Sequence, residues 1–374
     1  MDVKQAARAK AKKLADSLGY RSCGPVLVIE SDDWGATRVP SAEALDDFAG
    51  RHPEFRPDHY QRLDALDSYD DVASLRGVLL GVSNAAGEHP KVTMNFAMAN
   101  PDFGAIRDNG FSRFEYEPLQ TSYRRAGAGK TTLDALREAS SSGVLRPQLH
   151  AREHLNATSW LSDVRGGGAS RDAFDLGMVG VGGAEYCAMD ALNPLNADVD
   201  RVAYLAEAAA LFEATFGFSS KSFIASCYVW DGEVERILRA LGISQIQSGR
   251  FQRAPRRDGS LARRLRSMGS TTRCGQVLTV RNCNFETARW KDEGLSRAEI
   301  VERGVREVEE AFALRHPAVV CSHRVNYVSA VSPENAELGR GCLAEMLERV
   351  TEAHPDVRFL FSDELGDEIR GARR

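Results

Sequence analysis

The sequence predicts an α/β fold, a barrel or strongly twisted sheet of parallel strands, on three observations. The chain has 374 residues, of which 43% are hydrophobic and 27% charged, which is enough to bury one large core. Short apolar, β-branched runs recur along it and alternate with helical patterns, as parallel strands require. Polar residues directly follow several of these runs, at the strand ends where such folds place their sites.

Each predicted strand is a short apolar run, and the predicted helices follow capping residues or amphipathic patterns. The predicted strands cover residues 26–29, 91–96, 147–149, 222–230, 243–246, 277–280, 319–321 and 357–361. The predicted helices cover residues 42–48 after Ser41, 70–80, 133–139 after Thr131 or Thr132, 199–216 and 232–241, and Ser362 caps a last helix. Strands and helices therefore alternate through most of the chain.

Three segments interrupt this alternation. Residues 51–69, rich in His, Pro and Asp, predict an irregular excursion on the side where the strands exit. The glycine-rich residues 165–183 predict a mobile loop or lid. The arginine-rich residues 250–273 lie among Gly and Ser and predict a solvated loop.

These segments set the predicted domain organisation. The first twenty residues carry lysines and arginines among alanines, which predicts a basic amphipathic helix. We expect a helical extension over residues 1–20, and a single barrel domain over residues 21–374 with insertions near 51–75 and 160–198.

Charge and hydropathy exclude several classes of partner. The net charge of -5 gives no general attraction for nucleic acid or anionic membranes. The first twenty residues lack the apolar core of a secretory signal, and no apolar span of 18 residues occurs. We therefore expect a cytoplasmic protein with no nucleic-acid partner and no membrane span. The sequence does not indicate an oligomeric state.

The seven cysteines are widely spread, and no two of them form a Cys-x-x-Cys pair. This pattern argues against both a disulfide framework and a cysteine zinc site, so we expect most of them to be buried apolar residues.

Two adjacent carboxylates, Asp32 and Asp33, follow the first predicted strand. Adjacent residues leaving a strand point to opposite sides, so the two carboxylates can have different environments. One of them could bind a cation, while the other takes a proton from water. The alternative is structural, because Asp residues at strand ends often cap turns or helices.

His150 and His154 follow the strand at 147–149, with three residues between them. Two imidazoles at this spacing can converge on one cation, and an Asp oxygen as third ligand would leave a position open for water and substrate. The alternative is two unrelated polar histidines in a loop.

The same segment also fits the His-x-x-Glu-His pattern of inverzincin metallopeptidases, in which Glu153 would activate water. That interpretation needs the motif inside a long helix and a distant acidic ligand, for which Glu233 or Glu235 would be candidates. Pro147 shortly before the motif disfavours such a helix.

His323 follows another apolar run, 318–320. Because the pKa of histidine is adjustable around neutrality, His323 could protonate the leaving amine of a hydrolysed amide. A purely structural hydrogen bond is the alternative.

Taken together, the ordered Asp-Asp-x-Gly, His-x-x-x-His and late Ser-His motifs resemble the polysaccharide deacetylase superfamily, the NodB-homology or carbohydrate esterase 4 group. The resemblance runs from about Val26 to Leu365. It implies a distorted (β/α) barrel of the glycoside hydrolase/deacetylase type with loop insertions. It also implies one divalent metal ion, Zn above all with Co, Ni or Mn as alternatives, and removal of an N-acyl group, chiefly acetyl, from an amino sugar.

The resemblance also implies a role for each motif residue. Asp32 matches the general base, and His323 matches the general acid. Asp33, His150 and His154 match the three metal ligands. Tyr228 matches the residue whose main-chain N–H stabilises the oxyanion together with the metal.

Several positions depart from the family pattern. Ala225 stands where the family has the arginine that pairs with the base, and we conjecture that Arg281 or Arg324 supplies this charge. Ser226 and Cys227 replace the prolines of the same motif, and Ala151 replaces a hydroxyl residue after the first metal histidine. Trp34, beside the Asp pair, predicts either core packing or stacking on a sugar ring.

These departures indicate a divergent branch and leave the substrate open. Alternatives on the same site are a hydrolase of a small non-sugar or cyclic amide and a non-catalytic saccharide-binding barrel. We expect a small molecule or an oligosaccharide as substrate, such as an intracellular glycan precursor or metabolite rather than mature wall polymer.

Overall fold

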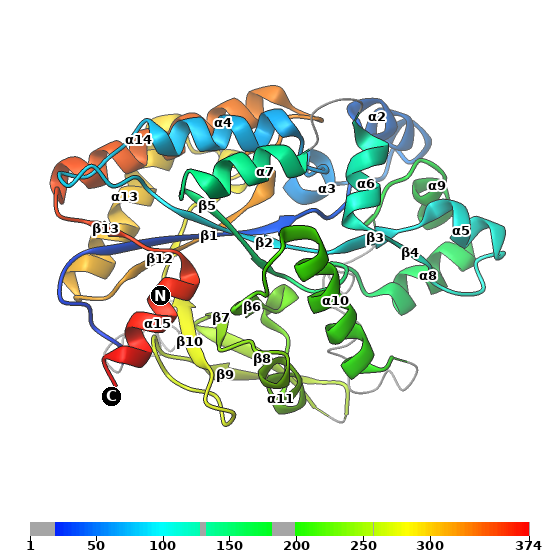
Figure 1. The fold of residues 1–374 in the computed structure, drawn as a ribbon. Helices are drawn as coiled ribbons and strands as arrows, with labels where there is room; N and C mark the ends of the chain where they lie inside the picture. The colour runs from blue at the N-terminus through cyan, green and yellow to red at the C-terminus, as the bar shows by residue number, and fades with distance from the viewer. Residues whose placement is uncertain (1–18, 128–131, 182–198, 257, 374) are drawn as a thin grey trace, which may run out of the picture.

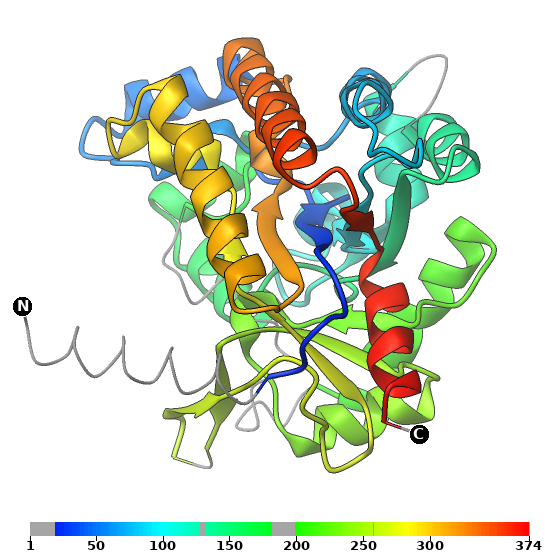
Figure 2. The same ribbon diagram turned by 90° about the vertical axis from the view of Figure 1, so that its left-hand side faces the viewer.

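The computed structural model describes residues 19–127, 132–181, 199–256 and 258–373. Helices surround a nearly closed barrel of eight parallel strands, as two views at right angles show (Figures 1 and 2). The predicted α/β barrel is therefore confirmed.

The barrel is one sheet in which every pairing is parallel. Its strands, in spatial order, are β10 (Val277–Arg281), β7 (Gln245–Gly249), β6 (Ser222–Ile224), β5 (Leu145–Leu149), β2 (Val92–Phe96), β1 (Val26–Trp34), β12 (Ala318–His323) and β11 (Cys283–Asn284), with β13 (Arg358–Phe359) beside β1. Only Asn282 separates β10 from β11, so the two ends of the sheet approach each other. Two antiparallel pairs lie apart from it: β3 (Ala99–Pro101) with β4 (Tyr116–Pro118), and β8 (Phe251–Pro255) with β9 (Leu261–Leu265).

Helices cover the outside of the barrel (Figures 1 and 2). They are α2 (Ala42–Arg51), α3 (His59–Leu63), α4 (Tyr69–Leu80), α5 (Phe103–Asp108), α6 (Leu119–Ala126), α7 (Thr132–Ser141), α8 (Ala157–Gly166), α9 (Ala169–Asp175), α10 (Arg201–Phe216), α11 (Gly232–Ala240), α12 (Thr287–Asp292), α13 (Arg297–Ala313), α14 (Pro333–Ala353) and α15 (Ser362–Gly371). Short 3-10 turns, η3 (Ser226–Tyr228) and η4 (Arg324–Asn326), follow β6 and β12. Helix α4 packs between α7 and α14, and α13 packs against α14.

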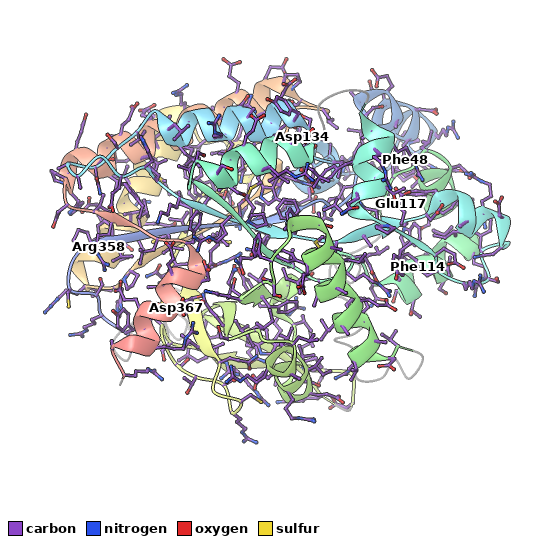
Figure 3. All side chains as sticks on the ribbon, viewed as in Figure 1. Phe48, Phe114, Glu117, Asp134, Arg358 and Asp367 are labelled. Atoms are coloured by element: carbon purple, nitrogen blue, oxygen red, sulfur yellow. The ribbon has the colours of Figure 1, made fainter. Side chains whose placement is uncertain are left out.

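Strand β1 is central because all nine of its residues are buried. Leu27 and Ile29 pack into the large core under the helices, whereas Val26 and Val28 pack against Leu365 and Ile369 of α15 in a second cluster. Glu30, on the same side of the strand as Val26 and Val28, pairs with Arg281. Figure 3 shows side chains filling the space between sheet and helices, with Arg358 and Asp367 at the periphery.

The local helix signals predicted from the sequence are also present. The Ser41 hydroxyl accepts a hydrogen bond from the Ala44 main-chain N–H at 3.2 Å and caps α2. Helix α4 spans Tyr69–Leu80, one residue earlier than predicted at its start. These features are set by neighbours in the sequence, which explains why they were predictable.

Two predictions about loops were wrong. Within residues 165–183, the described part contains the end of α8 and all of α9, joined at Gly167 and Gly168, both at positive φ. These helices pack Val164 and Phe174 into one small core. The glycines thus turn the chain between two helices, and do not form a long loop.

The basic segment 250–273 contains the β8–β9 hairpin. Gln252 and Ala254 alternate inward with outward Arg253, so the period is two, as in a strand with one buried face. Of the predicted strand and exit at 222–230, the strand ends at Ile224, and the exit contains η3, in which Cys227 and Tyr228 adopt positive φ.

Most of the predicted N-terminal helix and part of the predicted insertion at 160–198 lie outside the described residues. The six cysteines in the described ranges are free thiols. No helix of the described ranges combines the length and the apolar character needed to cross a lipid bilayer.

Candidate active site

A β-bulge brings both carboxylates of the first motif to one pocket. The pairing of β1 with β2 shifts between Ser31 and Trp34, so that Asp32 and Asp33 together oppose a single residue of β2. Asp33 adopts φ 72°, a left-handed conformation that Asp tolerates better than most residues. The bulge therefore overrides the strict alternation expected from a regular strand, and both side chains line the same pocket.

Gly35, which follows Trp34 at the end of β1, is required by the turn of the chain at this position. Gly35 has φ 79°, and a Cβ at this position would lie 2.7 Å from the Ala97 carbonyl oxygen. Its main-chain N–H donates to Asp67 Oδ1 at 2.8 Å. A larger residue here would push the end of β1 away from its neighbours and move the two carboxylates with it.

Asp33, His150 and His154 converge at the ends of β1 and β5. Asp33 Oδ1 lies 3.3 Å from His150 Nε2 and 3.2 Å from His154 Nε2. Bonds of about 2.0–2.1 Å at a tetrahedral angle would separate two such ligand atoms by about 3.3 Å. Both imidazole nitrogens therefore lie from Asp33 Oδ1 at the spacing of neighbouring ligands of a tetrahedral cation, and the three residues form one of two candidate metal groups in the described chain.

The conformation of the His-x-x-x-His segment excludes the helical metallopeptidase alternative. Residues 150–154 are not helical, and Ala151 turns the chain with φ 103° so that His154 returns toward His150. Of the candidate distant ligands, Glu233 pairs with Arg201, and Glu235 accepts a hydrogen bond from the Trp230 indole.

The hydrogen bond of His150 defines how its ring can act. Its Nδ1 lies 2.9 Å from the Ile224 carbonyl oxygen, which can only accept, so Nδ1 carries a proton. In the neutral ring, Nε2 then presents a lone pair to the Asp33 carboxylate. Two acceptors facing each other at this distance need a positive charge between them. In metal sites, the ring nitrogen of a histidine that does not bind the metal commonly donates a hydrogen bond to a main-chain carbonyl in this way.

Burial and neighbouring charges fix the charge states of two of the ligands. Burial lowers the pKa of His154 to about 3, and Arg38 contributes to the decrease, so the ring is neutral at pH 7. Burial raises the pKa of Asp33, but His154 and Arg38 more than offset this and bring it well below its usual value. A neutral imidazole and an ionised carboxylate are the forms in which these side chains coordinate metals.

Asp32 is held by Arg281, one of the two arginines conjectured from the sequence to pair with it. Arg281 donates from Nη1 and Nη2 to the two oxygens of Asp32, each at 2.7 Å, and from Nε to Glu30 at 2.7 Å. Asn95 donates to Asp32 as well. Burial raises the pKa of Asp32, but Arg281 more than offsets it and lowers the pKa to about 2, so Asp32 is ionised at neutral pH.

Glu286 is a site residue that the sequence analysis missed. Its Oε1 lies 2.6 Å from His323 Nδ1, while His323 Nε2 lies 3.9 Å from Asp32 Oδ2. Burial lowers the pKa of His323, but Glu286 more than offsets it and raises the pKa well above 6.5. Glu286 follows β11, so the only available signal was an acidic residue after an apolar run too short to recognise as a strand.

Glu286, Cys321 and His323 form the second candidate metal group, but their spacing indicates a hydrogen bond. At 2.6 Å, the Glu286 oxygen and the His323 nitrogen are closer than two tetrahedral ligands would be and match a charge-assisted hydrogen bond. Burial raises the pKa of the Cys321 thiol, which disfavours the thiolate that a metal needs.

Three further residues from the sequence analysis are engaged within the protein: Trp34, Arg324 and the main chain of Tyr228. Trp34 is fully buried and donates to Ser31 Oγ at 2.9 Å, so it packs in the core. Arg324 is fully buried and pairs with Asp64 and Asp67, because η4 directs it away from the pocket. The Tyr228 main-chain N–H donates to the Ala225 carbonyl at 2.9 Å, so it is engaged within η3.

The pocket around these residues has a volume of about 630 Å³. Its outer wall comes from the predicted excursion at 51–69, including Phe55 and Tyr60, and from residues 179–181. The Tyr60 ring meets the His323 ring edge to face, with centroids 5.3 Å apart. This volume falls in the range of small-molecule sites, about 300–1,000 Å³.

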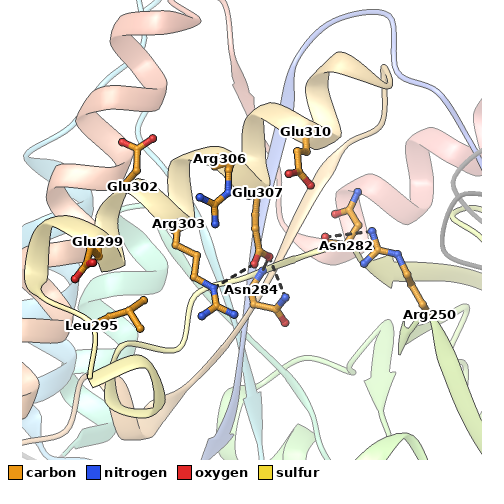
Figure 4. A pocket seen from close by; sticks show the side chains of 10 residues that line it. All are labelled: Arg250, Asn282, Asn284, Leu295, Glu299, Glu302, Arg303, Arg306, Glu307 and Glu310. Atoms are coloured by element: carbon orange, nitrogen blue, oxygen red, sulfur yellow. Dashed lines mark hydrogen bonds and ion pairs between the residues drawn. The ribbon is translucent and has the colours of Figure 1, made fainter. Parts of the chain in front are cut away.

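A second cavity, of about 490 Å³, lies between α13 and the β10–β11 turn (Figure 4). Its walls carry arginines and glutamates that neutralise one another, such as Arg303 and Glu307. None of its lining residues is His, Cys or Asp. It therefore lacks the imidazoles that the first pocket places beside its carboxylates.

No family model matches this sequence, and no curated protein matches it. Among solved structures, a 4-alpha-glucanotransferase from Thermococcus litoralis is 11% identical with a TM-score of 0.43, and the match covers 91% of this chain and 40% of that chain. A CE4 family pseudoenzyme from Bacillus anthracis is 11% identical with a TM-score of 0.41, covering 93% and 68%. A family 4 carbohydrate esterase from Streptomyces lividans, in complex with acetate, is 9% identical with a TM-score of 0.36, covering 92% and 97%.

Proposed function

We propose that this chain is a metal-dependent hydrolase that removes an N-acyl group, chiefly acetyl, from an amino sugar or saccharide. The observation that carries the proposal is the convergence of His150 Nε2 and His154 Nε2 on Asp33 Oδ1, at 3.3 Å and 3.2 Å. The resemblance of the motifs to polysaccharide deacetylases supports the choice of substrate class.

A divalent cation held by Asp33, His150 and His154, with Zn as the first choice, would polarise the acyl oxygen and lower the pKa of a bound water. Asp32 remains outside the ligand set and, being ionised, would accept a proton from the attacking water. Arg281 holds both Asp32 oxygens, which fixes the carboxylate and limits its basicity. Glu30 shares the Arg281 guanidinium and offsets part of that effect.

His323 would protonate the leaving nitrogen, since an amide nitrogen leaves poorly without a proton. Its side chain is 21% exposed to the pocket, and Glu286 keeps the ring protonated and oriented. The 3.9 Å between His323 Nε2 and Asp32 Oδ2 lets the proton acceptor and the proton donor serve adjacent atoms of one tetrahedral centre. Water adds to the acyl carbon as the carbon–nitrogen bond breaks, and the proton taken by Asp32 balances the proton given by His323.

The test combines metal content with turnover. Purified protein is assayed with Zn²⁺, Co²⁺, Ni²⁺ and Mn²⁺ on chitooligosaccharides, nucleotide-linked N-acetylhexosamines and small cyclic and linear amides. Release of acetate from an amino sugar is the expected result, and its loss on chelation should be reversed by added metal. If only the small amides are turned over, the substrate is a small amide and not an amino sugar. If the protein binds one metal ion but turns over none of these compounds, a saccharide-binding barrel is favoured.

Removal of a ligand is expected to abolish metal binding. Asp33→Ala or His150→Ala should weaken metal affinity by more than about 100-fold, beyond the loss seen when an outer-shell partner is removed. Metal content is measured by elemental analysis after gel filtration. His89→Ala is the matched control, because His89 binds the Val82 carbonyl and is not part of either metal group. Stoichiometric metal in Asp33→Ala would contradict the ligand set.

The pH profile tests the partnership of His323 and Glu286. His323 acts in its protonated form, so activity is lost as pH rises through its raised pKa, and the alkaline limb should lie above pH 6.5. Glu286→Gln removes the charge that raises this pKa, so the alkaline limb of kcat/KM should move to lower pH. Glu302→Gln, which removes an exposed carboxylate on α13, should leave the limb in place. An unchanged limb in Glu286→Gln would exclude His323 as the group that titrates.

A further inference from the structure

Arg38 contacts two of the proposed metal ligands at once. Its Nη2 lies 3.2 Å from Asp33 Oδ2 and 3.3 Å from His154 Nδ1. Its Nε lies 2.8 Å from Asp64 Oδ2. The side chain is only 12% exposed, so water screens these contacts weakly.

The contact with His154 conflicts with coordination through the same ring. A guanidinium only donates, so His154 Nδ1 must accept, and the proton of the neutral ring then lies on Nε2. Coordination through Nε2 would require the neutral ring to carry its proton on Nδ1, where it would face the Arg38 N–H. His150 has no such conflict, since its Nδ1 faces a carbonyl oxygen.

The contact between Arg38 and Asp33 also competes with a bound cation. Arg38 places a positive charge beside Asp33 Oδ2, while the two imidazoles face Oδ1. A bound divalent cation would neutralise the same carboxylate, and two positive charges beside one carboxylate repel each other.

We infer that Arg38 is an internal cation that competes with the metal for Asp33 and His154 and so sets the metal affinity of the site. The inference rests on the ligand set of the proposed function. Metal binding and the Arg38–His154 hydrogen bond exclude one another, so each ion bound has to displace that bond.

Asp64 makes this exchange possible without leaving Arg38 unpaired. Asp64 is fully buried and binds Arg38 through one oxygen and Arg324 through the other, at 2.8 Å and 3.0 Å. Arg324 in turn binds Asp67. Arg38 can therefore release His154 and still keep a buried counter-charge. It acts on the metal through its ligands, so it is a positioning residue.

The test measures the Zn²⁺ and Co²⁺ affinity of the full chain by competition with a chromophoric chelator, without any substrate. Arg38→Met is expected to bind both ions about 10- to 100-fold more tightly than the wild type, the range over which groups around the ligands tune affinity. Arg38→Lys keeps the positive charge but loses the several N–H donors of the planar guanidinium. The metal affinity of this variant should therefore fall between those of the wild type and Arg38→Met. Arg201→Met is the matched control: Arg201 is 10% exposed and also pairs with two carboxylates, Asp231 and Glu233.

Unchanged or weaker affinity in Arg38→Met would overturn the inference, because Arg38 would then support the ligands or be indifferent to them. If Arg38→Met does not fold, as judged by circular dichroism, Arg38→Lys and Arg38→Gln decide by the same criterion. If the Arg38 variants bind metal more tightly but the wild type turns over no acylated substrate, the inference about Arg38 stands and the proposed activity is wrong. Absence of binding in the wild type and all Arg38 variants would overturn both.

Discussion

Asp32→Asn is expected to lower kcat by about 10²- to 10⁴-fold, the contribution typical of a positioned general base. Asparagine has nearly the same shape but cannot accept a proton from water. Asp33 and the two histidines are untouched, so metal content should stay stoichiometric. The measurement pairs initial rates, on whichever acylated substrate the wild type turns over, with elemental analysis of the same samples.

Asp32→Asn is informative because it should lower the rate without changing the metal content. Asp46→Asn, on the exposed face of α2, is the control for the amide substitution itself and should leave both values unchanged. Loss of metal in Asp32→Asn would mean that Asp32 belongs to the ligand set. Full activity with full metal content would mean that the proton goes to another group, and the division of labour between the two carboxylates would be wrong.

Arg281→Met is expected to lower the free energy of unfolding by about 3–5 kcal/mol, the cost of removing one partner from a buried ion pair. Arg281 is buried and pairs with two buried carboxyl groups, Glu30 and Asp32. Without it, both must be protonated or remain unpaired inside the barrel. Activity should also fall, because Asp32 loses the two donors that fix its orientation.

Urea unfolding followed by circular dichroism measures this effect. Arg264→Met, at an exposed position of β9, should change the free energy by no more than about 0.5 kcal/mol. Adding Glu30→Gln to Arg281→Met should recover part of the loss, since one fewer buried carboxylate then lacks a partner. Stability equal to that of the wild type in Arg281→Met would show that the three charges do not depend on one another.

The sequence alone predicted the elements that depend on neighbours in the chain. The apolar run of β1, the Ser41 cap of α2 and the helix α4 all follow from short-range periodicity and capping. The rule that polar residues gather where parallel strands exit placed Asp33, His150 and His154 near one another, and the structure brings both histidines within 3.3 Å of Asp33 Oδ1. That rule is general because every strand of a parallel sheet ends on the same side.

The tertiary structure alone decided which partner each site residue has. The bulge that directs both Asp32 and Asp33 into the pocket depends on the register of β1 against β2. Arg281 and Arg324 were equal candidates in the sequence, but β10 brings Arg281 to Asp32, whereas η4 directs Arg324 to Asp64. Glu286 reaches His323 across 37 residues.

These contacts join residues from different strands, and their distances depend on how the barrel closes. Strand length and capping are local properties of the chain, whereas bulges, register and the pairing of buried charges are settled only when distant segments pack together. The sequence therefore determined which residue types reach the mouth of the barrel. Packing determined which of them pair there, because each buried charge requires a partner that only the folded barrel brings within reach.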